Sequence, residues 1–195
     1  MTNTQIDELI EQLKSKGVKF HSGLTQAEVL RIQETFGFKF PPDLKHLLQT
    51  ALPVSEGFCN WRQALTSEAV AGEIHARLRW PLEGMLFDIK ENKFWAESWG
   101  QKPELIAEQC SVAEMNFRSY PTLIPVYSHR YIPDEPTIHD NPVFSVYQMD
   151  IIYYGYNLAS YLASEFRFTL SENFEEIEEP KHDIEFWTWC VEHNC

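Results

Sequence analysis

Two kinds of apolar periodicity follow one another along the chain, and their order limits the folds that it can adopt. Near the start, apolar residues such as Ile6, Leu9 and Leu13 recur three or four positions apart, which is the spacing of an amphipathic helix. Between residues 122 and 155, short runs are rich in β-branched and aromatic residues, which is typical of strands. Helical spacing then returns, and no strand alternates regularly with a crossover helix. This order predicts one α+β domain that spans residues 1–195.

Capping residues indicate where the helices begin and end. Thr4 and Gly17 are suited to the two ends of the first helix. In the second helix, Glu28 follows Thr25 by three residues, which is the pattern of a capping box, and Gly37 ends the segment. The same reasoning predicts further helices over residues 40–53, 66–79, 103–119, 157–168 and 183–193.

The strand-like runs predict an antiparallel sheet. Residues 122–128, 143–149 and 151–155 are separated by proline-containing loops or a short acidic turn. Because these links hold no crossover helix, antiparallel pairing is expected. Another change of period occurs in residues 85–100, where apolar residues flank the polar sequence Lys-Glu-Asn. That segment is predicted to form a β-hairpin.

The charge of the chain narrows the class of partner. The 195 residues include 29 acidic and 16 basic ones, which gives a formal net charge of −13. Nucleic acids and anionic membranes bind basic surfaces, so we expect neither as a ligand and favour a basic protein instead. The chain has no apolar run long enough to span a bilayer, and its first residues lack the pattern of a secretory signal. A cytoplasmic location is therefore expected.

A proline-containing segment, residues 128–140, holds two histidines and three acidic residues. Because proline disfavours helices and central strands, the segment is predicted to be a loop. His129, His139 and Asp140 could serve a metal-dependent hydrolase, since imidazole and carboxylate groups bind zinc and other divalent ions. No HxH or HExxH spacing fixes their geometry. A rigid loop without a metal is therefore favoured, and the hydrolase is kept as the alternative.

The cysteines give no stronger indication of a metal or cofactor. They are spread along the chain without a CxxC pair, which favours reduced thiols. A second set of potential soft-metal ligands occurs near the end of the chain, with a spacing that matches no zinc motif. This set is His182, Cys190, His193 and Cys195. The chain also lacks a GxSxG motif, and we predict that it has no catalytic role and uses no cofactor.

Aromatic and acidic residues are the candidates for contact with a partner. Tyr and Trp side chains beside acidic groups commonly anchor protein interfaces, and acidic groups speed the encounter with a basic surface. The candidate partner-binding residues are Trp99, Tyr131, Asp134, Glu135, Asp140, Asp150, Glu175 and Glu176. Trp99 and Tyr131 are expected in loops, where their rings can be exposed.

Four segments together resemble the SUKH superfamily, also called the Smi/Knr cell-wall-assembly-regulator family. They are GLTQAEVLRIQETFGFKFPPDLKHLLQ (residues 23–49), FWAESWGQKP (94–103), LIPVYSHRYIPDEP (123–136) and NPVFSVYQMDIIYYGYNLASYLASEF (141–166). The resemblance covers about residues 23–168, which leaves residues 171–195 as a C-terminal extension. The sequence ALPVSEGFCNW, residues 51–61, departs from the Asn-Gly-Gly-like turn of many members.

The resemblance implies both a fold and a role. The family fold is α+β, with a mostly antiparallel, twisted sheet flanked by helices, and it offers no catalytic motif. Bacterial members are commonly immunity proteins that sequester the toxin domain of a polymorphic toxin, often a nuclease. The chain is therefore expected to be a bacterial, non-catalytic immunity protein or antitoxin that binds a basic toxin domain. A regulatory scaffold of the cell-wall-assembly-regulator type is a further alternative beside the hydrolase.

Overall fold

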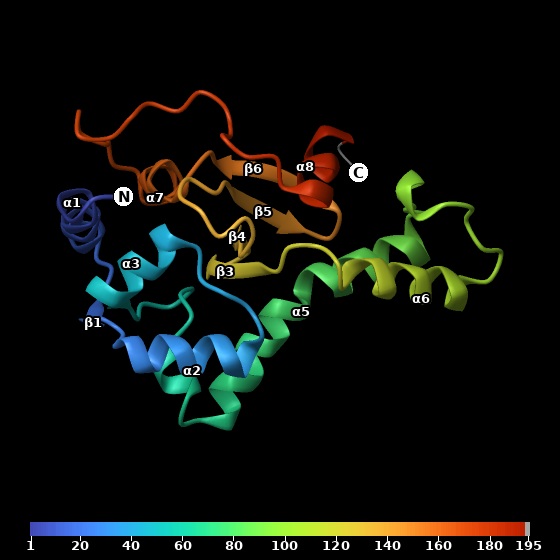
Figure 1. The fold of residues 1–195 in the computed structure, drawn as a ribbon, viewed down its shortest axis with the longest axis horizontal. Helices are drawn as coiled ribbons and strands as arrows, with labels where there is room; N and C mark the ends of the chain where they lie inside the picture. The colour runs from blue at the N-terminus through green and yellow to red at the C-terminus, as the bar shows by residue number, and fades with distance from the viewer. Residues whose placement is uncertain (194–195) are drawn as a thin grey trace.

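Helices and antiparallel sheets make up the computed structural model, which describes residues 1–193 (Figure 1). The helices are α1 (Asn3–Ser15), α2 (Gln26–Phe36), α3 (Pro42–Thr50), α4 (Trp61–Ala64), α5 (Glu68–Glu91), the 3-10 turn η1 (Glu97–Trp99), α6 (Ile106–Phe117), α7 (Leu158–Phe166) and α8 (Glu185–His193). The strands are β1 (Phe20–Ser22), β2 (Ala51–Pro53), β3 (Leu123–Tyr127), β4 (Arg130–Pro133), β5 (Val143–Tyr147) and β6 (Asp150–Gly155). The α+β class and the antiparallel sheet flanked by helices are confirmed.

Most helices begin where capping residues predict. At the start of α2, Thr25 Oγ1 accepts a hydrogen bond from the Glu28 N–H at 3.2 Å, and Glu28 Oε2 accepts one from the Thr25 N–H at 2.7 Å. For α1, the capping residue is Thr2 rather than Thr4, because Gln5 lies three residues after Thr2 and completes a capping box. The small β1–β2 sheet and the short helix α4 were not predicted.

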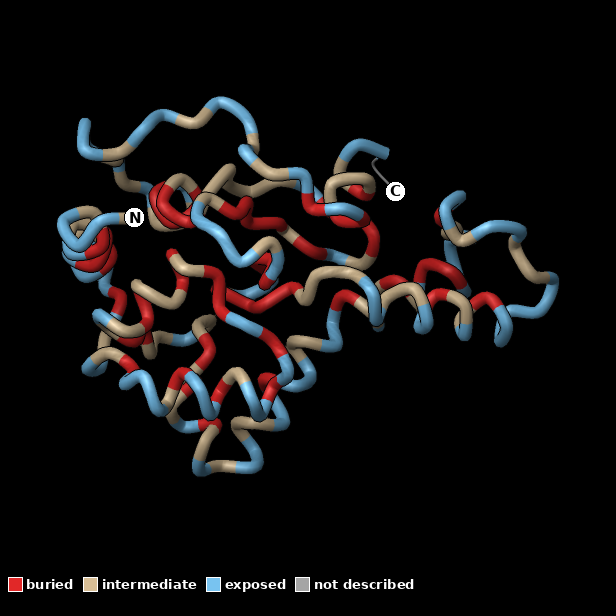
Figure 2. Tube along the Cα trace, viewed as in Figure 1, coloured by how far each residue is buried: buried red, intermediate tan, exposed pale blue. Residues whose placement is uncertain are grey.

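Most residues of β3, β4 and β5 in the larger sheet are buried (Figure 2), because helices pack on both faces of the sheet. Its strands follow the order β3-β4-β5-β6, and each neighbouring pair is antiparallel. Alternate residues of a strand point to opposite faces, so the Tyr131 side chain of β4 joins one hydrophobic cluster and the Ile132 side chain joins another. The Ile132 face packs against α1, α2, α3, α7 and the first half of α5, whereas the Tyr131 face packs against the second half of α5, α6 and α8.

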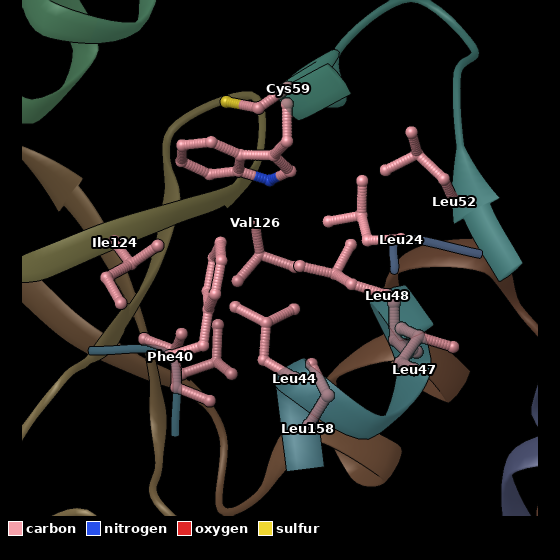
Figure 3. Packing of buried hydrophobic residues seen from close by; sticks show 14 of the residues in the cluster. Leu24, Phe40, Leu44, Leu47, Leu48, Leu52, Cys59, Ile124, Val126 and Leu158 are labelled. Carbon is pink, nitrogen blue, oxygen red and sulfur yellow. The ribbon is translucent and has the colours of Figure 1, made fainter. Parts of the chain in front are cut away.

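Leucines of α3 form the centre of the cluster on the Ile132 face. Figure 3 shows Leu44 and Leu48 directed towards Val126 of β3 and Leu158 of α7. These side chains are at most 5% exposed, and each buried leucine contributes about 1.5 to 3 kcal/mol of hydrophobic stabilisation. The helical spacing read from the sequence therefore places α3 against the sheet.

The prediction that the whole segment 128–140 is a loop is wrong, because the segment contains strand β4. The first two residues of β4 pair with β5, whereas its last residue, Pro133, pairs only with Leu123 of β3. Proline lacks the N–H that a ladder on the β5 side would need. Pro133 therefore lies at the end of β4, beyond the residues that pair with β5, where its missing N–H breaks no ladder.

The predicted β-hairpin over residues 85–100 is wrong, because α5 continues to Glu91. Met85 and Ile89 are buried four residues apart, which is helical spacing. The polar Lys-Glu-Asn sequence lies at the end of this helix and does not turn a hairpin. The helix predicted over residues 66–79 stops short of Pro81, and α5 runs through this proline although proline interrupts most helices.

Pro81 is accommodated inside α5 because a side chain from the sheet replaces a lost donor. A proline has no N–H to bond to the carbonyl four residues earlier, which here belongs to Arg77. The Tyr131 hydroxyl instead donates a hydrogen bond to the Arg77 carbonyl oxygen at 3.0 Å. Tyr131 is 2% exposed, and this burial raises its pKa to about 12, so the hydroxyl keeps its proton at neutral pH.

The second half of α5 lies beside α6, and the two project from the rest of the molecule (Figure 1). The connection between them returns to α8, where the Trp99 ring stacks on Phe186 with centroids 6.0 Å apart. Leu105, Ile106 and Met115 are exposed at α6. No helix within residues 1–193, α5 included, is long and apolar enough to cross a membrane.

A double-mutant cycle tests how Pro81 is accommodated. We expect Tyr131→Phe to lower the free energy of unfolding by about 1 to 3 kcal/mol, because the Arg77 carbonyl then loses its donor. In a Pro81→Ala background, the new backbone N–H can bond to the same carbonyl, so Tyr131→Phe should cost less. Urea unfolding of the four proteins measures both costs. Equal costs in the two backgrounds would contradict the proposed compensation.

Candidate functional site

Two of the predicted partner-binding residues are buried. Tyr131 in β4 is 2% exposed, and Asp134, directly after β4, is 9% exposed. The Asp134 carboxylate accepts a hydrogen bond from the Thr122 N–H at 2.7 Å, which ties the end of β4 to the start of β3. The expected exposure of Tyr131 and Asp134 is therefore wrong, because the strand that the sequence prediction missed draws both side chains into the fold. Glu135, the next residue, is exposed beside α2.

The acidic segment between α7 and α8, residues 167–184, contains the exposed candidates Glu175 and Glu176. Lys181 Nζ lies 2.7 Å from Glu175 Oε2 and 3.2 Å from Asp140 Oδ2. Two of the predicted acidic contacts are thus already paired with a lysine of the same chain. Such surface ion pairs contribute little to stability.

Polar side chains attach the same acidic segment to α1. Ser171 Oγ donates a hydrogen bond to Glu8 Oε2 at 2.9 Å, and the Asn173 carbonyl accepts one from Gln5 Nε2 at 2.7 Å. No residue of the segment belongs to a strand of either sheet. The acidic segment therefore lies across the surface and is fastened mainly by its side chains.

The residues of the hydrolase alternative are not grouped as metal ligands. His139 Nδ1 lies 2.8 Å from Asp43 Oδ1 at the start of α3, and the Asp140 N–H donates to Asp43 Oδ2 at 2.9 Å. His129 lies in the β3–β4 turn, 3.2 Å from Ser128 Oγ. In the described part of the chain, no group of three or more His, Cys, Asp or Glu side chains is arranged to hold a metal ion.

The C-terminal set of potential ligands is also dispersed. His182 Nε2 lies 2.8 Å from the carbonyl oxygen of His139. Cys190 is buried in the cluster on the Tyr131 face of the sheet. His193 stacks on Trp189. Cys195, the fourth member of the set, lies outside the described residues.

A cleft of about 410 Å³ lies between the end of α5, the β5–β6 turn and α8. Its lining combines aromatic, acidic and amide side chains, and we call it the aromatic cleft. The lining residues are Asp88, Asn92, Phe94, Trp95, Gln148, Asp150 and Trp189. The cleft brings the predicted partner-binding residue Asp150 to the tryptophan-rich segment that contains Trp99, whose ring meets Trp95 edge to face at 5.1 Å.

Close packing of α5 on the β5–β6 turn fixes one wall of the aromatic cleft. Gly84 of α5 has no side chain, and a Cβ added there would lie 2.6 Å from the Gln148 Cα. One turn later, Asp88 Oδ2 accepts a hydrogen bond from the Met149 N–H at 2.8 Å, and Oδ1 accepts one from Asn92 Nδ2 at 2.6 Å. Asp88 is 6% exposed, so an almost buried carboxylate joins the helix to the turn.

Hydrogen bonds and ring contacts hold the aromatic walls in place. Trp95 Nε1 donates to the Gly100 carbonyl oxygen at 2.9 Å. Phe94 meets Trp189 edge to face with centroids 6.4 Å apart, and His193 stacks on Trp189 at 4.5 Å. Because these rings are fixed by their neighbours, a ligand of the cleft would lose little affinity to the cost of ordering them.

Exposed rings lie close in sequence to residues of the cleft and its wall, in α5 and at the end of β5. Trp80 and Phe87 lie one helical turn before and after Gly84, and they are 44% and 47% exposed. Tyr147, which precedes Gln148 at the end of β5, is 60% exposed. Large apolar side chains grouped around one turn are typical of an interaction surface.

The sequence prediction does not include Asp88, Gln148 or Trp189 in the site. Asp88 falls within the segment predicted as a hairpin, where it would have no reason to meet the β5–β6 turn. The one usable signal is that Asp88 and Asn92 are four residues apart, which is the spacing of neighbours on a helix. That signal requires α5 to continue past Pro81.

A matched pair of glycine substitutions in α5 tests the wall of the cleft. We expect Gly84→Ala to lower the free energy of unfolding by about 1 to 3 kcal/mol, because its Cβ would push against the Gln148 backbone. Gly72→Ala is the control, since a Cβ there meets nothing within 4 Å. It should stabilise the protein by up to about 1 kcal/mol. If denaturant unfolding shows Gly84→Ala to be equally stabilising, the close packing is refuted.

The buried carboxyl group of Asp134 leads to a second prediction, which concerns how the stability of the fold depends on pH. Burial raises the pKa of Asp134 from 3.8 to about 6. The folded chain therefore binds this proton more readily than the unfolded chain, and stability falls as the pH rises from about 4 to about 6. We expect Asp134→Asn to raise the free energy of unfolding by about 1 to 3 kcal/mol near pH 7 and to change it little near pH 4. Destabilisation near pH 7, measured by thermal and urea unfolding, would contradict this.

The chain shows no similarity to known proteins in three comparisons. No protein-family model matches it, and neither does any curated protein or any solved structure. The SUKH resemblance is neither supported nor contradicted by this result. It stays a prediction that rests on the sequence motifs.

Proposed function

We propose that the chain is a non-catalytic protein-binding module with a basic protein partner, and that the aromatic cleft and its exposed neighbours are the contact surface. One observation carries this proposal: Asp88 and Asp150 share a single cleft with Phe94, Trp95 and Trp189. Aromatic side chains that are fixed beside acidic groups are typical anchors of protein interfaces.

The charge of the chain supports a basic partner. A formal net charge of −13 creates a field that attracts positively charged proteins and speeds their encounter. Rings that lose water on contact, such as those of Phe87 and Trp95, then slow dissociation. Binding of this kind needs no covalent bond to be made or broken.

We further propose that the partner is a toxin domain, so that the chain acts as an immunity protein or antitoxin. This step rests on the SUKH resemblance, because bacterial members of that superfamily commonly sequester toxin domains. A nuclease has a basic groove for its nucleic acid, and an acidic surface is suited to cover it. Neutralisation would then follow from stoichiometric occupation of the groove.

The hydrolase and the regulatory scaffold remain the alternatives. Stoichiometric zinc or manganese that is lost together with hydrolytic activity on His139→Ala would favour a hydrolase that uses His129, His139 and Asp140. A partner that takes part in cell-wall assembly and is not a toxin would favour the scaffold. Metal analysis of the purified protein separates the first alternative from the binding module directly.

Coexpression with the product of a neighbouring gene that ends in a nuclease-like domain tests the proposal. We expect a one-to-one complex and complete loss of nuclease activity at that ratio. Because charge steers the encounter, the association rate should fall roughly tenfold or more between about 50 and about 500 mM salt. Surface-binding kinetics measure the rate, and unaided turnover of a substrate by the chain would overturn the proposal.

A pair of surface variants locates the interface in that complex. Phe87→Ala should raise the dissociation rate about tenfold, since it removes a ring beside the aromatic cleft. Leu30→Ala on α2 is the control, because Leu30 and Phe87 are both 47% exposed. Equal effects of the two variants would place the interface elsewhere.

A further inference from the structure

The aromatic cleft has the chemistry to bind one particular side chain. We infer that it binds the guanidinium group of an arginine from the protein partner. This inference rests on the proposed function, since it names the group by which a basic partner is held. The test of the arginine site uses no protein partner, so the arginine site and the proposed function can fail independently.

The two carboxylates of the cleft lack a cation of their own. Among the ion pairs within residues 1–193, none includes Asp88 or Asp150. Each oxygen of Asp88 accepts a hydrogen bond, one from the Met149 N–H and one from Asn92 Nδ2. A carboxylate oxygen can accept two hydrogen bonds, so each keeps capacity for a further donor. Two acidic groups that line one cleft attract a cation.

The aromatic walls favour arginine over lysine as that cation. A guanidinium is planar and weakly hydrated, stacks on aromatic rings and donates to carboxylates through several N–H groups. Its methylene stem can lie along the rings of Phe94, Trp95 and Trp189, which line the same cleft. A lysine ammonium is more strongly hydrated, so removing its water on entry to the cleft would cost more free energy. The volume of about 410 Å³ admits a single long side chain.

One ring that lines the cleft already meets a cation of the chain, which is not itself a lining residue. Lys102 Nζ lies 5.8 Å from the centroid of the Trp95 ring, within the range of a cation–π interaction. The same ammonium donates a hydrogen bond to the Lys93 carbonyl oxygen at 2.8 Å. The Trp95 ring therefore already interacts with one positive charge, and we expect Lys102 to compete with an arriving guanidinium for this ring. Removal of the Lys102 charge should strengthen arginine binding.

Titration with a small arginine probe tests the inference. N-acetyl-arginine methylamide is added to the ¹⁵N-labelled chain, and the indole N–H signals of Trp95 and Trp189 are followed by NMR. We expect saturable shifts with a dissociation constant on the order of millimolar, as befits one side chain. The citrulline analogue has the same shape without the charge, and it should bind at least about fivefold more weakly.

Three variants give expected changes of different sign. Asp150→Asn should weaken binding of the arginine probe about two- to fivefold. Asp7→Asn, at an exposed position of α1, changes the net charge equally and should leave binding unchanged. Lys102→Gln should tighten binding about twofold or more, because it removes the competing cation. A purely structural role of these residues would not produce this pattern.

Three results would overturn the inference. They are equal shifts with the arginine and citrulline probes, equal effects of Asp150→Asn and Asp7→Asn, and binding of N-acetyl-lysine methylamide as tight as that of the arginine probe. Because the titration uses no protein partner, each would reject the arginine site and leave the toxin complex to its own test. Conversely, arginine binding without complex formation would reject the proposed partner and retain the site.

Discussion

The hydrogen bond from the Tyr131 hydroxyl to the Arg77 carbonyl joins the sheet to α5 at the position where Pro81 leaves the helix without its own donor. Pro81 cannot supply that bond, and without another donor a helix commonly ends or kinks at such a position. With the donor in place, α5 continues beyond the proline, and Gly84 and Asp88 reach the β5–β6 turn. The aromatic cleft thus requires α5 to continue past Pro81, and the sheet supplies the bond that the helix backbone cannot make there.

Local signals in the sequence predicted the parts of the fold that depend on neighbouring residues. The Thr25 capping box and three of the strands formed as expected, because caps and strand patterns are set within a few positions. The extension of α5 and the strand β4 could not be predicted in this way. Both involve contacts between distant parts of the chain: the Tyr131 hydroxyl bonds to Arg77, 54 positions earlier, and β4 pairs with β3 and β5. A proline considered without its tertiary contacts therefore predicts the end of a helix or strand where the folded chain continues it.

The candidate site was predictable in its chemistry but only partly in its location. Composition indicated acidic groups and rings, and Asp150 does lie beside the tryptophan-rich segment. Tyr131 and Asp134 have the same chemistry, yet the fold uses them internally. Whether such a side chain faces a partner or the core depends on strand pairing, which residue type does not reveal. Asp88 and Trp189 meet only after α5 and α8 are placed on one face of the sheet.

The acidic segment between α7 and α8 affects how the chain can be divided. It is fastened through side chains such as Ser171 and Lys181, whereas α8 buries Phe186 and Trp187. A peptide bond cut inside this segment would expose neither ring, so α8 would stay seated as a separate fragment. The buried contacts of α8 with the rest of the chain, rather than the peptide bonds of the acidic segment, would then hold the two pieces together.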